Sequence, residues 1–383
     1  MQTKLIPLAI VVANALVFAA GAQAQEVVKI GYAGPMSGQS AHLGKDTQNG
    51  TRLAVEDLNA KGFKIDGKPV KFVLLAEDDA ADPKQATSAA QKLADAKING
   101  MIGHQTSGTS IPASRIYYNA GIPQISASAT SPVYTHQKFN TTFRVVANDN
   151  KLGASLGQYA VQKLGAKKIA VIDDRTAYGQ GVADEFGKGA RKAGAGAVQI
   201  VAREFTNDKA TDFNAILTSI RSKNPDLVFF GGMDSVGGPL LRQMRALGIK
   251  AKLMGGDGIC TEAMPRLAGA TAGDESIVCA EAGGITPEQE KKMAEFGERY
   301  KKRYNESLQI YAPYAYDAVM TMATAMAEAK SADPKKYLPY LAKVKYAGIT
   351  GDIAFDSFGD IRDGALTLYT FKGGKRTLIE VVK

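Results

Sequence analysis

Hydroxyl-rich segments follow two short apolar runs in the first third of the chain. Gly103–Ser110 follows the run Ile98–Ile102, and Ser126–Pro132 follows the run Ile122–Ile125. If both runs are parallel strands, the polar segments lie at carboxyl ends of strands, where open α/β sheets bind ligands. Hydroxyls and free backbone N–H groups gathered there would suit a polar or anionic ligand.

The first of these segments leads into a helical pattern over Ser110–Ala120. Unpaired N–H groups at the start of a helix attract a carboxylate. Ser107 is therefore a candidate for holding a ligand carboxylate. The plainer alternative is that hydroxyls here only cap the helix, through Thr109 or Ser110.

Motifs that would indicate catalysis are missing from the sequence. Gly31–Gly34 has the wrong spacing for dinucleotide binding, Gly231–Gly232 lacks a third glycine, and neither a phosphate-binding loop nor a Gly-x-Ser-x-Gly elbow is present. His104 is three residues from Ser107, too close along an extended chain to act as its base. We predict no enzyme, no catalytic residue and no cofactor.

The two cysteines, Cys260 and Cys279, lie 19 positions apart. In an exported protein such a pair predicts a disulfide, and two buried free thiols are the alternative. His42, His104 and His136 show no metal-ligand spacing, so we predict no metal site.

The start of the chain has the pattern of a signal peptide. One lysine precedes the apolar stretch Leu5–Ala20, and the small residues of Ala22–Ala24 fit a cleavage site near Ala24–Gln25. Residues 1–24 would then be removed on export. The alternative is an uncleaved anchor, but Pro7 interrupts the apolar stretch.

Composition indicates a soluble globular chain with a sizeable core. Of 383 residues, 45% are hydrophobic and 22% are charged, and the length suggests two domains. The net charge is +9, but 47 basic residues are interspersed with 38 acidic ones. The run Lys301–Arg303 lies in a helical pattern with Glu295 and Glu298, typical of a solvated helix face. We therefore expect no nucleic-acid partner.

Short apolar runs alternate with helical patterns, which argues for parallel strands joined by helical crossovers. In the first part the strands are expected at Val27–Tyr32, Val70–Ala76, Ile98–Ile102 and Ile122–Ile125, and the helices at Thr47–Ala60, Pro83–Asp95 and Ser110–Ala120.

The alternation restarts after about residue 147, so we predict a second α/β lobe of similar layout. Its strands are expected at Lys168–Asp173, Val198–Arg203, Asp226–Phe230, Lys252–Gly255 and Ser276–Ala280, and the helices at Asn150–Leu164, Gly181–Ala193, Phe213–Ser222, Pro239–Leu247, Pro287–Tyr304 and Tyr311–Ala329. Ile353–Phe355 and Ala365–Phe371 are expected to form late hairpin strands that pair with a sheet already formed.

Five ordered motifs carry a family resemblance: Val28–Gly38, Asp78–Ala86, Gly103–Ser114, Asp173–Gly181 and Gly359–Asp360. Together they resemble the periplasmic leucine/isoleucine/valine-binding proteins over nearly the whole mature chain. That family supplies the soluble capture subunit of ATP-driven importers.

The resemblance implies an α/β fold with two doubly wound lobes joined by a three-crossing hinge, the type I periplasmic binding protein fold. Lobe 1 would comprise residues 25–147 and 281–367, and lobe 2 residues 148–280 and 368–383. The crossings are expected near Val146–Asn148, Cys279–Gly283 and Leu366–Leu368.

Family roles transfer by position in the same way. Ser107 matches the serine that holds the ligand carboxylate, and Ser128–Thr130, with Ala129 at its centre, matches a loop that contacts both ends of the ligand. Tyr178 matches a tyrosine that closes over the ligand. Asp257 falls where the family carries a glutamate facing the ammonium group, and Tyr311 at an aromatic position of the side-chain pocket.

Some positions depart from the family pattern. Asp257 is one methylene shorter than glutamate, and Leu43 and Met233 stand where the family often has aromatic residues, which leaves a softer wall. The family's first-lobe disulfide positions are Ala81 and Thr106 here, so Cys260–Cys279 would be a replacement cross-link in the second lobe.

The resemblance therefore predicts a periplasmic protein that captures an aliphatic, or aromatic, L-amino acid, most simply a branched-chain one. A membrane permease would be its partner, and we expect a monomer. The alternative is a receptor of the same fold for an amide or urea-type molecule, which would not need the Asp257 carboxylate. An exported hydrolase would instead show turnover that depends on Ser107.

Overall fold

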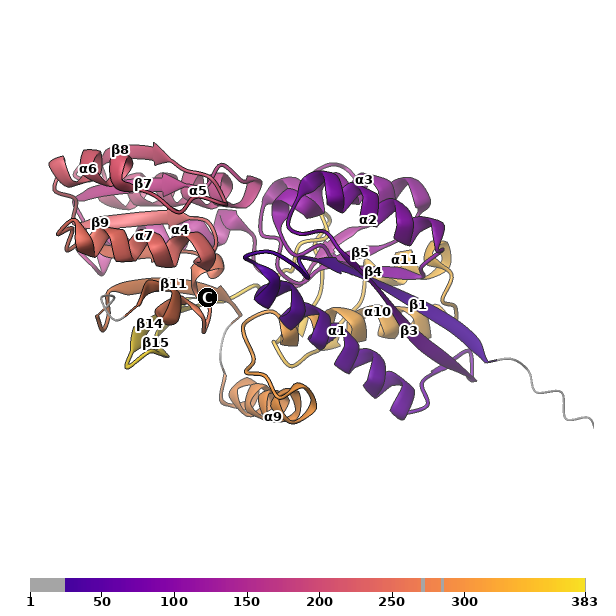
Figure 1. Cartoon of the computed structure of the whole chain (residues 1–383). Helices are drawn as coiled ribbons and strands as arrows, with labels where there is room; N and C mark the ends of the chain where they lie inside the picture. Colours follow the sequence, from indigo (N-terminus) through magenta and orange to yellow (C-terminus); the bar gives the residue numbers. More distant parts are fainter. Residues whose placement is uncertain (1–24, 270–272, 284–285, 383) are drawn as a thin grey trace, which may run out of the picture.

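The computed structural model describes residues 25–269, 273–283 and 286–382, and it contains two α/β lobes (Figure 1). We call the part built on the first sheet the first lobe and the part built on the second sheet the second lobe. The predicted signal peptide lies outside the described residues. No helix in the described part of the chain is long and apolar enough to cross a membrane.

The first sheet has the strand order β2-β3-β1-β4-β5-β6. Five of its strands are parallel, and the short β2 pairs antiparallel with β3. The strands are β1 (Glu26–Gly34), β2 (Lys64–Ile65), β3 (Lys68–Asp78), β4 (Gly100–Gly103), β5 (Gln124–Ser126) and β6 (Thr142–Arg144).

The second sheet has the order β15-β14-β11-β10-β9-β7-β8. Its parallel strands are wound in the same way as those of the first sheet. β7 pairs with β8 on one side and with β9 on the other, as β1 pairs with β3 and β4. β10 and β11 follow in order beside β9. The strands are β7 (Lys168–Asp173), β8 (Gln199–Phe205), β9 (Leu227–Gly231), β10 (Lys252–Gly255), β11 (Ile277–Ala282), β14 (Leu366–Lys372) and β15 (Lys375–Val382).

Helices connect and cover these sheets. They are α1 (Ala41–Ala60), α2 (Pro83–Asp95), α3 (Ser107–Ala120), α4 (Asp149–Gln162), α5 (Ala177–Gly194), α6 (Asn214–Ser222), α7 (Asp234–Ala246), α8 (Met264–Ala268), α9 (Pro287–Tyr304), α10 (Ala312–Glu328) and α11 (Pro334–Leu341). Two single 3₁₀ turns, η1 (Pro132–Tyr134) and η2 (Asp257–Ile259), and a small hairpin of β12 (Tyr346–Ala347) and β13 (Asp352–Ile353) complete the fold.

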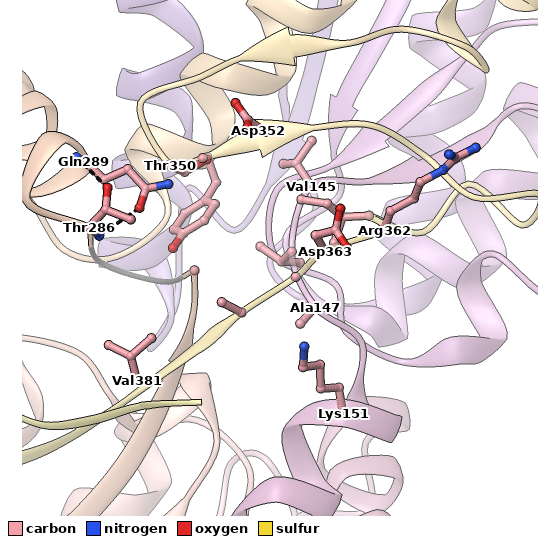
Figure 2. Close-up of a pocket in the computed structure, with 17 residues that line it drawn as sticks. Val145, Ala147, Lys151, Thr286, Gln289, Thr350, Asp352, Arg362, Asp363 and Val381 are labelled. Atoms are coloured by element: carbon pink, nitrogen blue, oxygen red, sulfur yellow. Dashed lines mark hydrogen bonds between the residues drawn. The ribbon is translucent and has the colours of Figure 1, made fainter. Parts of the chain in front are cut away.

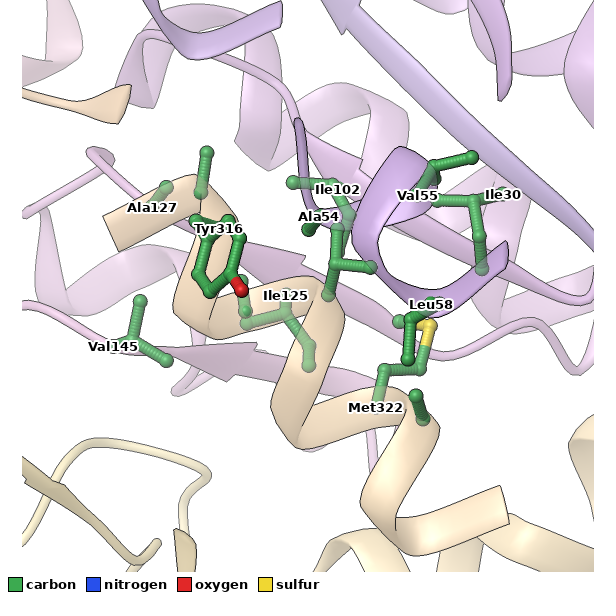
Figure 3. Packing of buried hydrophobic residues seen from close by; sticks show 14 of the residues in the cluster. Ile30, Ala54, Val55, Leu58, Ile102, Ile125, Ala127, Val145, Tyr316 and Met322 are labelled. Carbon is green, nitrogen blue, oxygen red and sulfur yellow. The ribbon is translucent and has the colours of Figure 1, made fainter. Parts of the chain in front are cut away.

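The first-lobe core shows how distant segments combine (Figure 3). Ile30 from β1 and Ile102 from β4 pack with Leu58 of α1 and with Tyr316 and Met322 of α10. Burial of such side chains contributes roughly 1.5–3 kcal/mol each. The chain must therefore return to the first lobe after building the second.

Several helices begin earlier than the sequence pattern suggests. α3 begins at Ser107, because Thr106 rather than Thr109 or Ser110 is its N-cap and forms a capping box with Thr109. α7 begins at Asp234 and contains Pro239 in its interior, so that proline does not mark the start of the helix. In contrast, α2 begins at Pro83 as predicted, since Asp82 accepts hydrogen bonds from the N–H groups of its first turn.

Only part of the expected late pairing is present. Ala365–Phe371 corresponds to β14, which joins the second sheet together with β15, whereas Ile353 belongs to β13, which pairs only with β12 in a separate two-stranded sheet. β14 pairs antiparallel with β11 from Val278↔Thr370 to Ala282↔Leu366. Residues 279–282 and 366–368, expected near two of the crossings, are thus paired within the second sheet, and the Gly283 N–H still donates to the Ala365 carbonyl just beyond them. The division into lobes at 281 and 367 stays a prediction.

Cys260 and Cys279 form a disulfide with a Cα–Cα distance of 5.3 Å. It joins the segment after η2 to β11, so the predicted pair is present and the alternative of two free thiols is not.

Replacing both Cys260 and Cys279 with serine should lower the free energy of unfolding by about 3 kcal/mol, because a loop of about 20 residues loses its cross-link. Urea unfolding under non-reducing conditions measures this. Treating the natural protein with dithiothreitol is the control and should give the same shift. An unchanged midpoint in both would contradict a stabilising disulfide.

Candidate functional site

The predicted site residues follow carboxyl ends of strands in both sheets. Ser107 follows β4, the segment Ser128–Thr130 follows β5, Tyr178 follows β7, Met233 follows β9 and Asp257 follows β10. These edges are where doubly wound sheets bind ligands. Leu43 on α1 and Tyr311 at the start of α10 come from helices of the first lobe.

Ser107 occupies the first position of α3, because Thr106 is the N-cap. Its hydroxyl oxygen accepts a hydrogen bond from the backbone N–H of Ser131 at 3.1 Å. A hydroxyl that accepts one bond keeps its own hydrogen for donation. Ser107 can thus fix the Ser128–Ser131 segment and also donate to a carboxylate beside the helix N-terminus.

The segment after β5 uses most of its polar groups within the protein. The Ser128 hydroxyl donates to the carbonyl of Gln105 at 2.6 Å, and the Ala129 N–H donates to Ser126 Oγ at 2.8 Å. The buried Thr130 hydroxyl has no well-aligned hydrogen bond among the described residues. This hydroxyl lies beside the Asp149 carboxyl group, so Thr130 and Asp149 are candidates to contact a ligand together.

Asp257 is 5% exposed and accepts two tyrosyl hydrogen bonds. Tyr178 donates to Oδ1 at 2.9 Å and Tyr311 donates to Oδ2 at 2.8 Å. Burial raises the pKa of Asp257, and the two hydroxyls partly offset that effect. A carboxylate has about four acceptor positions, so two hydrogen bonds leave room for a cation. A turn aspartate at this place could instead cap the following helix, but the N-cap residue of α8 is Ala263.

The Tyr311–Asp257 hydrogen bond joins the two lobes. Tyr311 is held in the first lobe because Asp46 accepts the backbone N–H groups of four successive residues at the start of α10, which are Gln309, Ile310, Tyr311 and Ala312. Asp257 and Tyr178 belong to the second lobe. The structure therefore describes a closed arrangement in which the acidic end of the site is shielded from water.

Glycines on either side of Asp257 make room for Tyr178. A Cβ at Gly256 would lie 2.7 Å from the Tyr178 hydroxyl oxygen, and one at Gly258 would lie 2.9 Å from Tyr178 Cε1. The Gly258 N–H also donates to the Tyr178 hydroxyl at 3.0 Å. Any larger residue at these positions would displace the ring that closes against Asp257.

The apolar candidates lie around the same tyrosines. Leu43 and Tyr311, both from the first lobe, are buried in a cluster made chiefly of second-lobe residues, and Met233 packs against that cluster. A Cβ at Gly258 would lie 3.1 Å from Met233 Sδ, which places the thioether beside the Asp257 turn. Leu43 and Met233 thus contribute flexible aliphatic and thioether groups to this cluster.

Asp149 is a further candidate site residue, which the sequence analysis did not name. It is the first residue of α4, its N–H donates to the Thr130 carbonyl at 2.9 Å, and it is fully buried. Neither carboxylate oxygen has a well-aligned hydrogen bond among the described residues. Burial raises the pKa of Asp149 to about 8; the Thr130 hydroxyl beside the carboxyl group partly offsets that effect, and the nearby Asp257 charge adds to it. An aspartate at a helix start gives no sequence signal beyond capping.

The hydrolase alternative finds no support in the geometry. His104 is buried, its Nδ1 lies 2.7 Å from Asp79 Oδ2, and its Nε2 lies 3.2 Å from the Tyr117 hydroxyl. Both ring nitrogens are therefore engaged away from the Ser107 hydroxyl. The pair links the loops after β3 and β4, which is a structural role.

A cavity of about 670 Å³ lies elsewhere, where the chain passes between the lobes (Figure 2). Its walls include Val145, Ala147, Lys151, Asp363 and Val381, and none of the predicted site residues. Within the described residues, no group of three or more His, Cys, Asp or Glu side chains could hold a metal ion.

Sequence comparison agrees with this architecture. A family model described as periplasmic binding protein matches residues 27–375. The chain belongs to the periplasmic binding protein family. It is 34% identical over 365 residues to the Leu/Ile/Val-binding protein homolog 1 of Brucella abortus (strain 2308), covering 95% of each chain. It is 31% identical over 364 residues, again 95% of each chain, to the leucine-, isoleucine-, valine-, threonine-, and alanine-binding protein of Pseudomonas aeruginosa.

A solved structure is similar over nearly its whole length. The branched-chain amino acid transporter substrate-binding protein of Streptococcus pneumoniae, in complex with isoleucine, matches with a TM-score of 0.83 and 29% identity, covering 93% of this chain and 99% of that one. The predicted resemblance and the type I fold are thus confirmed. Members of this family are non-enzymatic solute-binding components of transporters, in line with the prediction of no enzyme. The individual site roles remain predictions.

A second contact between the lobes, His42–Asp234, includes a titratable histidine. Nε2 of His42 on α1 lies 2.8 Å from Oδ2 of Asp234 on α7. Asp234 also accepts a hydrogen bond from the Thr261 hydroxyl. Burial lowers the pKa of His42, but the bond to Asp234 outweighs it and the net shift is upward. The other charged groups facing His42 are Lys45, Arg266 and Glu306.

Closure should therefore weaken as pH rises through neutrality. The His42 pKa is raised in the closed form, so the contact contributes fully below the ordinary value of 6.5 and is lost above the raised pKa. Small-angle scattering from about pH 5.5 to about pH 8.5 measures the open fraction. His42→Gln and Asp234→Asn should both flatten the profile. An equally steep profile in both variants would contradict this role.

Proposed function

We propose that this chain is exported to the periplasm and captures an aliphatic, or aromatic, L-α-amino acid by lobe closure, most simply a branched-chain one. It would then deliver that ligand to the permease of an ABC importer. The names of the relatives support this proposal. The observation that carries it is a buried acidic end, Asp257 with Asp149, in a site that also contains the hydroxyl of Ser107 at a helix start.

An α-amino acid is a zwitterion and needs opposite partners at its two charged groups. Ser107 and the N-terminus of α3 would serve the carboxylate, while Asp257 and Asp149 would serve the ammonium group. Hydrogen bonds to charged groups contribute about 1.5–3 kcal/mol each. Three to five of them, less the ordering cost, support roughly micromolar binding or better.

The pocket wall favours an apolar ligand side chain. Leu43, Met233, Tyr178 and Tyr311 present carbon and sulfur atoms near the acidic end. A thioether and an isobutyl group adapt more readily than aromatic rings to branched side chains. We therefore place the aliphatic side chain against Leu43 and Met233.

The proposal also includes cleavage near Ala24–Gln25, a monomeric state and lobes divided near residues 147, 281 and 367. A monomer needs no second copy to complete the site, since both lobes come from one chain.

Asp257→Asn should weaken amino-acid binding by about 1.5–3 kcal/mol, or roughly 10- to 100-fold, because the charge opposite the ammonium group is lost. Ser107→Ala should weaken binding at the carboxylate end. A thermal-shift screen of all amino acids and short amides identifies the ligand, and calorimetry measures each variant. The exposed Asp184→Asn is the matched control and should bind normally. Unchanged affinity in Asp257→Asn would favour an amide or urea-type ligand.

Binding should release a proton near neutral pH. With a pKa of about 8 in the closed form, Asp149 is mostly protonated there when no ligand is bound, and an ammonium group beside it would favour the ionised form. Calorimetry in buffers of different ionisation enthalpy measures the number of protons released, and Asp149→Asn should remove that release. A binding enthalpy independent of buffer in the natural protein would rule out this linkage.

A further inference from the structure

Arg144 is a fully buried arginine whose role lies outside the binding scheme above. It is the last residue of β6, and it is 0% exposed. Its Nη1 donates to the carbonyl oxygens of Ala129 at 2.8 Å and Ser131 at 2.9 Å. Its Nη2 donates to the Thr135 hydroxyl and its Nε to the carboxylate of Asp360.

These contacts determine how the segment after β5 is turned. The carbonyls of Ala129 and Ser131 both point to the guanidinium, while the carbonyl of Thr130, between them, accepts the N–H of Asp149. The Thr130 carbonyl thus points away from Arg144, and the Thr130 side chain lies beside the Asp149 carboxyl group. Arg144 thus selects which groups of this segment remain for a ligand.

Asp360 connects the same guanidinium to the links between the lobes. It lies in the segment before β14 and accepts hydrogen bonds from the Thr135 hydroxyl and from Asn148 Nδ2, each at 2.8 Å. Asn148 is the N-cap residue of α4, in the first link, and the Arg144 N–H donates to the Gly359 carbonyl at 2.9 Å. Figure 2 shows these two links side by side, with Val145 and Ala147 near Asp363.

We propose that Arg144 and Asp360 are positioning residues that set the geometry of the Ser128–Ser131 binding segment and tie it to two of the three links of the hinge. This inference rests on the proposed function, because it assigns the segment to amino-acid binding. Gly359–Asp360 is one of the motifs that carry the family resemblance, and this proposal gives Asp360 a structural role.

The pair works through charge as well as shape. Burial raises the pKa of Asp360, but Arg144 and the donors Thr135 and Asn148 lower it below the ordinary value, so the carboxylate stays ionised at physiological pH. His136 Nε2 lies 3.5 Å from Asp360 Oδ2 and is the other titratable group facing it. Removing one partner of such a pair leaves a buried charge without compensation. The guanidinium would then no longer hold both carbonyls in place.

Hydrogen exchange and calorimetry on Asp360→Asn and Arg144→Lys test the proposal. The exchange probes are the N–H groups of Ser128, Ala129 and Ser131, all of which are hydrogen-bonded. The matched control is Asp317→Asn, another buried first-lobe aspartate, which holds the N–H groups of Ile349 and Thr350 instead. Asn148→Ala, which removes only the tie to the first link, is a milder variant should Asp360→Asn not fold.

We expect faster exchange at the three probe amides, unchanged exchange in β1, and about 10-fold or greater loss of amino-acid affinity in Asp360→Asn. Asp317→Asn should leave the probes and the affinity unchanged. Unchanged probe exchange, or a uniform increase that includes β1, would overturn the proposal, as would normal affinity in a variant with faster probe exchange. If the natural protein binds no amino acid, the proposed function fails, and the exchange result alone decides the positioning role.

Discussion

Desolvation of carboxylates between two lobes is the constraint on which the site depends. Burial of Asp257 and Asp149 disfavours their ionised forms, and each needs a compensating partner. Asp257 has two tyrosyl hydroxyls, whereas among the described residues Asp149 has only the poorly aligned Thr130 hydroxyl beside it. An incoming ammonium group would supply the missing charge. Without a cation, burial of these carboxylates is unfavourable. When a cation binds, the same burial strengthens its hydrogen bonds to the carboxylates, because water is excluded.

The first lobe meets this constraint with a rigid frame. Asp46 holds four backbone N–H groups and so places Tyr311, and Arg144 holds the carbonyls of the segment after β5. These contacts lie within one lobe, so they persist whether the lobes are open or closed. The second lobe brings Asp257 and Tyr178 to that frame when it closes. The site is thus half prepared before the ligand arrives, which lowers the ordering cost of binding.

Local signals explain how far the sequence predicted the fold. α2, β7, β10 and α9 have the predicted bounds because a cap, a proline or a continuous apolar run marks them. α3 differs because the capping box at Thr106 starts it before its apolar pattern begins. Two of the expected crossings overlap the ends of β11 and β14, since no local signal shows that these strands pair as far as Ala282↔Leu366.

The site residues were harder to predict than the fold, because the burial of a side chain and its hydrogen-bond partners depend on the folded structure. Ser107, Tyr178, Asp257 and Tyr311 follow from motif position, and their chemistry is visible in the residue type. Asp149 has the residue type of an ordinary helix-start aspartate, and only its burial next to Thr130 reveals a different role. Arg144 likewise resembles any strand-end arginine until its four acceptors are known.

Opening must break the contacts that cross between lobes and leave those within each lobe intact. The crossing contacts include the hydrogen bonds Tyr311–Asp257 and His42–Asp234. A typical intramolecular hydrogen bond has a net value of about 1 kcal/mol, because water replaces it on opening. Two such bonds cannot by themselves hold the lobes firmly shut, so the open and closed forms differ by little free energy. A ligand shifts that balance only by its differential affinity for the closed form. Under the proposed function, the charged ends of a zwitterion would each be bound mainly by a different lobe and would provide that difference.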